Sequence, residues 1–156
     1  MAQAADPYIV ALRLLAGRDY STASLRDRLA RRGYCHDVAA GVVARLERDG
    51  LLNDRRYAER FVAQNRASGR FVGYRLRQEL RRRGISAELA AVVMADEPDA
   101  QPEVELAREL VARRYAGFDP ASADERERRR IAGFLQRRGF GSETVRAVLD
   151  RRNLFD

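Results

Sequence analysis

Three ten-residue segments of the chain follow one pattern, and this repetition constrains the fold more than any other feature. They read LRDRLARRGY, LRQELRRRGI and IAGFLQRRGF, and each ends in two arginines, a glycine and an apolar residue. The glycines are Gly33, Gly84 and Gly139, which stand 51 and 55 residues apart. Sequence periods of this size are typical of repeat proteins, in which small units complete one another's cores.

Each position of the pattern has a role in a pair of helices. Leu29, Leu80 and Leu135 lie four residues before the glycine, and with an aliphatic residue four positions earlier they form the buried stripe of a short helix. The arginines of the last turn face the negative end of the helix dipole, and the glycine can take the left-handed conformation that ends the helix. An acidic residue four positions after the glycine and a valine nine after it predict a second helix.

An amphipathic segment precedes each pair, so the sequence predicts nine helices in three units of three. Asn53 or Asp54 is expected to cap the first helix of the second unit. No segment shows the sustained alternation of a β-strand. We therefore expect an all-α fold of three tandem three-helix, helix-turn-helix-like repeats in an elongated modular arrangement, with boundaries at residues 1–50, 51–97 and 98–156.

The chain is strongly basic, and its positive charge lies mainly on the middle helix of each unit. It has 30 arginines, no lysine, a formal net charge of +7 and a pI of about 10.4. Residues 70–84 and 126–139 each hold six arginines and one acid, whereas residues 96–109 hold six acids and one arginine. This balance favours a polyanionic partner. The helix after Gly84 has no basic residue and the helix after Gly33 is basic only near its end, which argues against a module that reads DNA bases in the major groove.

Arginines of the middle helices are the candidates for a surface that binds DNA phosphates or an acidic protein. Arg77, Arg81 and Arg82 lie off the leucine stripe of their helix and are the leading candidates. The full set is Arg26, Arg28, Arg31, Arg70, Arg75, Arg77, Arg81, Arg82, Arg128, Arg129 and Arg137.

A purely structural role is the alternative for these arginines. It applies best to Arg32, Arg83 and Arg138, which follow the core leucine by three residues. We expect their aliphatic stems to pack at the edge of the core while the charged ends reach water.

The sequence indicates neither catalysis nor a metal site. The single cysteine and single histidine, Cys35 and His36, are adjacent and lack a third ligand nearby, and no phosphate-binding glycine loop is present. We expect no cofactor, no metal and no enzymatic activity. The N-terminus lacks the basic leader of a signal peptide, and no apolar run reaches the roughly 18 residues of a membrane span. These features predict a soluble, cytoplasmic protein that does not bind membranes.

Two motifs in tandem resemble the RecX regulators of the bacterial RecA recombinase. They are GLLNDRRYAERFV, residues 50–62, and GYRLRQELRRRGIS, residues 73–86. The resemblance runs from about residue 12 to residue 93 and returns around FLQRRGFGSETVRAVL. The matching positions are Asp54, Arg56, Tyr57, Ala58, Phe61, Gly73, Leu76, Glu79, Leu80, Arg83, Gly84 and Ile85.

The resemblance implies a fold of three three-helix units and a protein partner. RecX proteins bind the RecA filament on single-stranded DNA and limit its ATP hydrolysis, strand exchange and extension. The chain would then act, as a monomer, in recombinational DNA repair and the SOS response, with direct contact to single-stranded DNA phosphates left open. The clustered arginines also support a second hypothesis, a general nucleic-acid-binding helical repeat protein without a dedicated protein partner.

Overall fold

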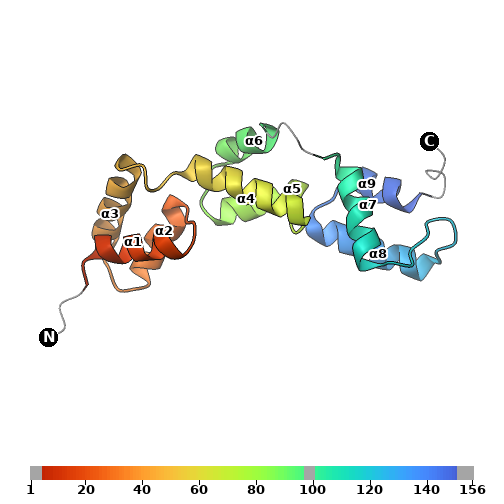
Figure 1. Ribbon diagram of the computed structural model, residues 1–156, viewed down its shortest axis with the longest axis horizontal. Helices are drawn as coiled ribbons and strands as arrows, with labels where there is room; N and C mark the ends of the chain where they lie inside the picture. Colours follow the sequence, from red (N-terminus) through yellow and green to blue (C-terminus); the bar gives the residue numbers. More distant parts are fainter. Residues whose placement is uncertain (1–4, 97–100, 151–156) are drawn as a thin grey trace. The chain divides into compact units, whose positions relative to one another are not determined.

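The computed structural model describes residues 5–96 and 101–150, and these residues form nine α-helices and no β-strand (Figure 1). The predicted all-α class is therefore confirmed. None of these helices has both the length and the apolar character needed to span a membrane.

The first three helices are α1 (Pro7–Gly17), α2 (Thr22–Ala30) and α3 (His36–Arg48). Asp6 begins α1 by accepting a hydrogen bond from the backbone N–H of Tyr8, with proline at the first helical position. The helices enclose one hydrophobic core. Its fully buried members are Ala11, Leu25, Leu29, Ala39 and Leu46.

The next three helices are α4 (Asp54–Ser68), α5 (Gly73–Arg82) and α6 (Ala87–Ala95). Packing divides the chain into two compact units, and both α4 and α5 contribute residues to each of them. Residues 54–61 and 80–95 pack with the first three helices, whereas residues 62–79 pack with the last three. The second sequence repeat therefore supplies parts of two cores.

The last three helices are α7 (Glu103–Arg114), α8 (Glu125–Arg138) and α9 (Ser142–Leu149). Their core includes a residue of the second repeat, Val72, as expected for repeats that complete one another. The other buried members are Leu106, Ala107, Leu110, Val111, Ile131, Leu135, Phe140, Val145 and Val148. The predicted boundary between the second and third repeats falls on residues 97–100, outside the described residues.

The three repeated glycines have the predicted backbone conformation. Gly33, Gly84 and Gly139 have φ angles of +92°, +78° and +103°, which L-amino acids rarely adopt. Each follows the middle helix of its repeat, and the residue after it bonds back to the core leucine. Tyr34, Ile85 and Phe140 each donate their backbone N–H to the carbonyl of Leu29, Leu80 or Leu135. The pattern that revealed the repeat is thus a helix C-cap used three times.

Candidate functional site

The second repeat contacts the start of α2 through a set of hydrogen bonds that we name the first joint. The carboxylate of Asp54, the first residue of α4, accepts from the backbone N–H of Thr22 at 2.7 Å and from its hydroxyl at 2.8 Å. The Ser21 hydroxyl donates to the backbone carbonyl of Arg83. Because Asp54 also faces the positive end of the α2 dipole, its charge stabilises this arrangement.

Gly84 lets the two backbones approach at the first joint. A Cβ atom at this position would overlap the Cβ atom of Ala23, near the start of α2. The position therefore requires glycine for two independent reasons, its positive φ angle and the absence of space.

The second joint repeats this arrangement between the third repeat and the start of α5. The backbone N–H of Val72 donates to the carbonyl of Arg138 at 2.9 Å. At the first joint the hydroxyl of Ser21 makes the corresponding bond to the carbonyl of Arg83. Val72 and Ser21 both stand 12 residues before the glycine of their own repeat. A Cβ atom on Gly139 would overlap the carbonyl oxygen of Val72.

The acidic residue of the first joint also has a counterpart in the second. Glu103 opens α7 as Asp54 opens α4, and its Oε1 lies 3.4 Å from the position that a Cβ atom would take on Gly73. The guanidinium of Arg138 adds a hydrogen bond of 2.7 Å to the carbonyl of Gly69. Both joints thus use the glycine turn of one repeat against the N-terminal end of the preceding middle helix.

Two candidate arginines of α5 are exposed and carry no ion pair among the described residues. They are Arg77 and Arg81, which are four residues apart and therefore lie on one side of the helix. Arg82, the last residue of α5, is exposed as well. The only acid between Glu59 and Glu88 in the sequence is Glu79, which is 7% exposed. The outer side of α5 therefore carries the cations Arg77 and Arg81, and no exposed acidic residue stands between Glu59 and Glu88 in the sequence.

Arg70 and Arg75 flank an aromatic ring near the start of α5. Their guanidinium carbons lie 5.3 Å and 5.7 Å from the ring centroid of Phe71, within the range of a cation–π interaction. Arg75 also pairs with the buried Glu79 at 3.2 Å. Arg70 is exposed, so it can bind a partner, whereas Arg75 is partly buried and paired with Glu79.

The structure gives Arg128 a structural role that the sequence did not indicate. Its guanidinium donates to the backbone carbonyls of Ala123 at 3.1 Å and Leu149 at 2.5 Å, and to that of Pro120. Because these bonds occupy Nε and both terminal nitrogens, we omit Arg128 from the binding surface.

The remaining candidates are all exposed. Arg129 forms an ion pair of 3.1 Å with Glu125, an arrangement that contributes little when both side chains face water. The others are Arg26, Arg28, Arg31 and Arg137.

The expected core-edge packing is confirmed for Arg83 and Arg138 and not for Arg32. Arg83 lies over the ring of Phe61 with 4.3 Å between the guanidinium carbon and the ring centroid, and Arg138 lies 4.7 Å over Phe134. Arg32 is exposed and forms no cation–π contact within the part of the chain that the structure describes.

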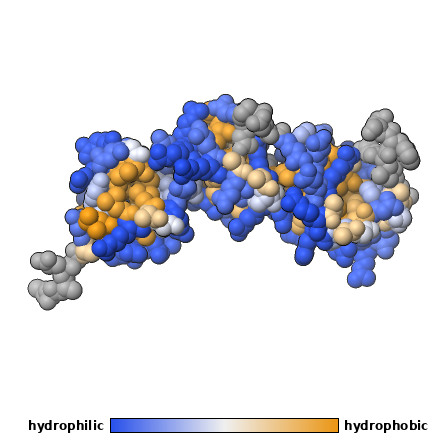
Figure 2. Space-filling view, viewed as in Figure 1, coloured by the Kyte–Doolittle hydropathy of each residue, from blue (hydrophilic) through white to orange (hydrophobic). Residues whose placement is uncertain are grey.

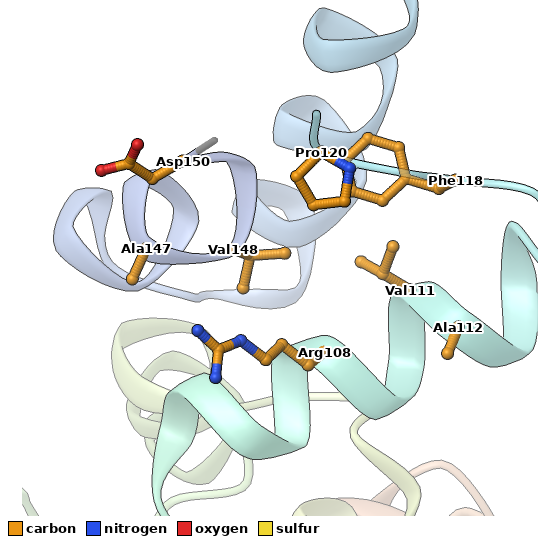
Figure 3. Close-up of a pocket in the computed structure, with 8 residues that line it drawn as sticks. All are labelled: Arg108, Val111, Ala112, Phe118, Pro120, Ala147, Val148 and Asp150. Atoms are coloured by element: carbon orange, nitrogen blue, oxygen red, sulfur yellow. The ribbon is translucent and has the colours of Figure 1, made fainter. Parts of the chain in front are cut away.

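The rest of the described structure shows an apolar pocket and no candidate metal site. The third repeat has an open apolar pocket of about 180 Å³, whose lining includes Val111, Phe118 and Val148 together with Arg108 (Figure 3). No group of three metal-ligating side chains occurs among residues 5–96 and 101–150. In the space-filling view polar residues cover most of the visible face, with an apolar area over the first repeat (Figure 2).

Comparison with known proteins identifies the family. Models of the first, second and third three-helix domains of RecX match residues 8–46, 53–94 and 101–149. The chain belongs to the RecX family. The match confirms the resemblance of the two motifs and extends it to the third repeat.

Two relatives named Regulatory protein RecX match over nearly their whole length. The one from Trichlorobacter lovleyi is 53% identical over 96% of this chain and 97% of its own. The one from Syntrophotalea carbinolica is 39% identical over 93% and 95%, respectively.

Solved RecX structures share the fold. The crystal structure of RecX from Lactobacillus salivarius superposes with a TM-score of 0.69 over 92% of both chains, at 20% sequence identity. A second structure, described as regulatory protein RecX, gives a TM-score of 0.71 over 92% of this chain and 70% of its own. The tandem three-helix architecture is therefore that of RecX.

Most of the RecX motif residues serve the joints and the cores. Asp54, Gly73 and Gly84 lie in the joints, and Leu80 is fully buried. Asn53, and not Asp54, caps α4, since its side-chain oxygen accepts from the backbone N–H of Arg56 at 2.9 Å.

The two aromatic motif residues stack on each other. The ring centroids of Tyr57 and Phe61 are 6.1 Å apart. Burial raises the pKa of the Tyr57 phenol, and the nearby Arg83 opposes that rise. These motif residues therefore pack within the protein.

The first joint predicts a measurable loss of stability when Asp54 is truncated. Asp54→Ala leaves the N–H of Thr22 without its acceptor, so the free energy of unfolding should fall by about 1–3 kcal/mol. Urea unfolding followed by circular dichroism measures this loss. Asp54→Asn keeps one acceptor oxygen and should lose less; equal losses for the two variants would contradict the assignment.

Proposed function

We propose that this chain regulates the RecA recombinase. It binds the RecA filament on single-stranded DNA and limits ATP hydrolysis, strand exchange and filament extension. The observation that carries the proposal is the match of RecX domain models to all three repeats. The relatives' designation as regulatory proteins supports it.

The outer side of α5 supplies the chemistry for such binding. Arg77 and Arg81 present guanidinium groups that form paired hydrogen bonds with carboxylates or phosphates. Acidic side chains of RecA and the backbone of its DNA both suit these groups. The protein acts by binding, as a monomer in the cytoplasm, and takes part in recombinational repair and the SOS response.

A RecA activity assay tests this proposal. RecA on circular single-stranded DNA is mixed with increasing amounts of the protein, ATP turnover is followed, and filament lengths are measured by electron microscopy. Turnover should fall and filaments should shorten at substoichiometric or equimolar protein. Unchanged turnover and length with the protein in excess over RecA would refute the proposal.

A general nucleic-acid-binding function is the second candidate, and the exposed arginines Arg77 and Arg81 of α5 favour it. Binding to naked DNA would then be tight and steeply dependent on salt, because neutralised phosphates release counterions. Weak binding to naked DNA beside strong binding to RecA would reject this candidate.

A further inference from the structure

An aromatic ring stands among the cations of α5 and serves no packing role. Tyr74 is 67% exposed, the most exposed of the large apolar and aromatic side chains that lie at the surface of residues 5–96 and 101–150. It belongs to none of the hydrophobic cores described above. A ring that packing does not require is free to contact a ligand.

The side chain of Tyr74 is held in place by its own helix. Gln78, one turn further on, donates from Nε2 to the phenol oxygen at 2.5 Å. This bond ties the phenol to its own helix, while the residue stays 67% exposed. Less conformational entropy is then lost when a ligand stacks on the ring.

Cationic side chains stand on both sides of Tyr74 in the sequence. Arg77 follows it by three residues and therefore lies on the same side of α5, while the exposed Arg70 precedes it. Phe71, covered by the guanidinium of Arg70, adds a second aromatic residue. The nearest acid in the sequence, Glu79, is buried and paired with Arg75.

We propose that Tyr74 is a stacking platform for a base of single-stranded nucleic acid, with Arg77 and Arg70 binding the adjacent phosphates. Exposed aromatic rings interleaved with arginines are the usual means of holding unpaired strands, because every base offers a π-face. A duplex hides its base faces and would leave the ring unused. The proposal rests on the proposed function, in which the ligand is the single-stranded DNA of a RecA filament.

A substitution series with an abasic control tests the platform. Binding of fluorescein-labelled dT20 is compared with that of an abasic strand of equal length. Tyr74→Ala should weaken binding to dT20 between about fivefold and about 150-fold, the range seen for loss of one stacked base. Tyr74→Phe keeps the ring face and should bind nearly as wild type. The abasic strand should not distinguish Tyr74→Ala from wild type.

Salt titration separates the ring from the cations. Tyr74→Ala should leave the slope of log affinity against log salt unchanged, whereas Arg77→Gln should reduce its magnitude by about 0.7, the value for one phosphate of a single strand. A change of slope for Tyr74→Ala would assign the ring a role in positioning arginines and overturn the stacking proposal.

A tryptophan reporter gives an independent readout, since the chain contains no tryptophan. The fluorescence of a Tyr74→Trp variant should be quenched by dT20 and not by duplex DNA of equal charge. Leu51→Trp, at another exposed apolar position, is the matched control and should show no quenching. A U20 strand shows whether the platform also accepts RNA. Absence of quenching together with full affinity of Tyr74→Ala for dT20 refutes the inference, as would equal quenching by duplex DNA.

The same variants show which of the two proposals has failed. If Tyr74→Trp is quenched by dT20 while RecA turnover is unaffected by wild-type protein, the platform stands and RecA regulation falls. If wild-type protein inhibits RecA and Tyr74→Ala binds dT20 as wild type does, RecA regulation stands and the platform falls.

Discussion

Changing Arg77, Arg81 and Arg82 to glutamate should abolish inhibition of RecA. The three side chains are exposed on α5, and their reversal replaces attraction to phosphates or carboxylates by repulsion. We expect the protein concentration for half-maximal inhibition of ATP turnover to rise by about tenfold or more. The free energy of unfolding should change little, because surface substitutions rarely cost much stability.

A second triple variant controls for net charge. Arg13, Arg48 and Arg114 are exposed, lie outside the candidate surface and have no ion pair among the described residues. Changing them to glutamate lowers the formal net charge from +7 to +1, as the α5 variant does. It also places glutamates at helix C-termini, as at Arg82, so the dipole penalty is matched. Equal loss of inhibition in both variants would assign the effect to net charge and not to α5.

Replacing Gly84 by alanine should destabilise the protein by about 2–5 kcal/mol. The φ angle of +78° costs an L-residue about 1–2 kcal/mol, and the overlap of the new Cβ atom with Ala23 adds about 1–3 kcal/mol. Denaturant unfolding measures the sum. Gly33→Ala is the matched control, because Gly33 has the same type of conformation and no atom within 4 Å of its Cβ position. Gly33→Ala should lower the free energy of unfolding only by the cost of the positive φ angle, about 1–2 kcal/mol.

The overlap between a Cβ atom at position 84 and the Cβ atom of Ala23 can also be removed by changing Ala23. Without the Cβ atom of Ala23, the next nearest atom is its Cα at 3.7 Å, an ordinary contact. Ala23→Gly should therefore restore about 1–3 kcal/mol to Gly84→Ala in a double-mutant cycle. Strict additivity of the two substitutions would show that this close approach does not exist in solution.

The sequence predicts features that depend on one helix and its neighbouring turn. The leucine stripe and the glycine C-cap are local, so the three-helix units and the conformation of Gly33, Gly84 and Gly139 followed from spacing. The hydrogen-bond partner of Asp54 could not be predicted in this way, because Thr22 belongs to another repeat and no periodicity links the two residues. The structural role of Arg128 could not be predicted either, because the loop before α8 and the end of α9 position the carbonyls that it contacts.

The candidate site was predicted only in part, for a similar reason. The sequence marked Arg77 and Arg81 as lying off the leucine stripe, and both are exposed. Tyr74 was missed, although it also lies off that stripe, three residues before Arg77 and four before Gln78. Aromatic residues are usually assigned to cores, and only the exposure of Tyr74 in the structure shows that this one is not buried.

Main-chain hydrogen bonds between repeats can explain how the tandem three-helix fold is kept when the sequence diverges widely. At the second joint the backbone N–H of Val72 donates to the carbonyl of Arg138, and this bond does not depend on side-chain identity at either position. A fold held in this way can keep its geometry at 20% identity, as its likeness to the Lactobacillus salivarius protein shows. Outward-facing positions such as those of α5 can then adapt to a changing partner without altering how neighbouring helices dock.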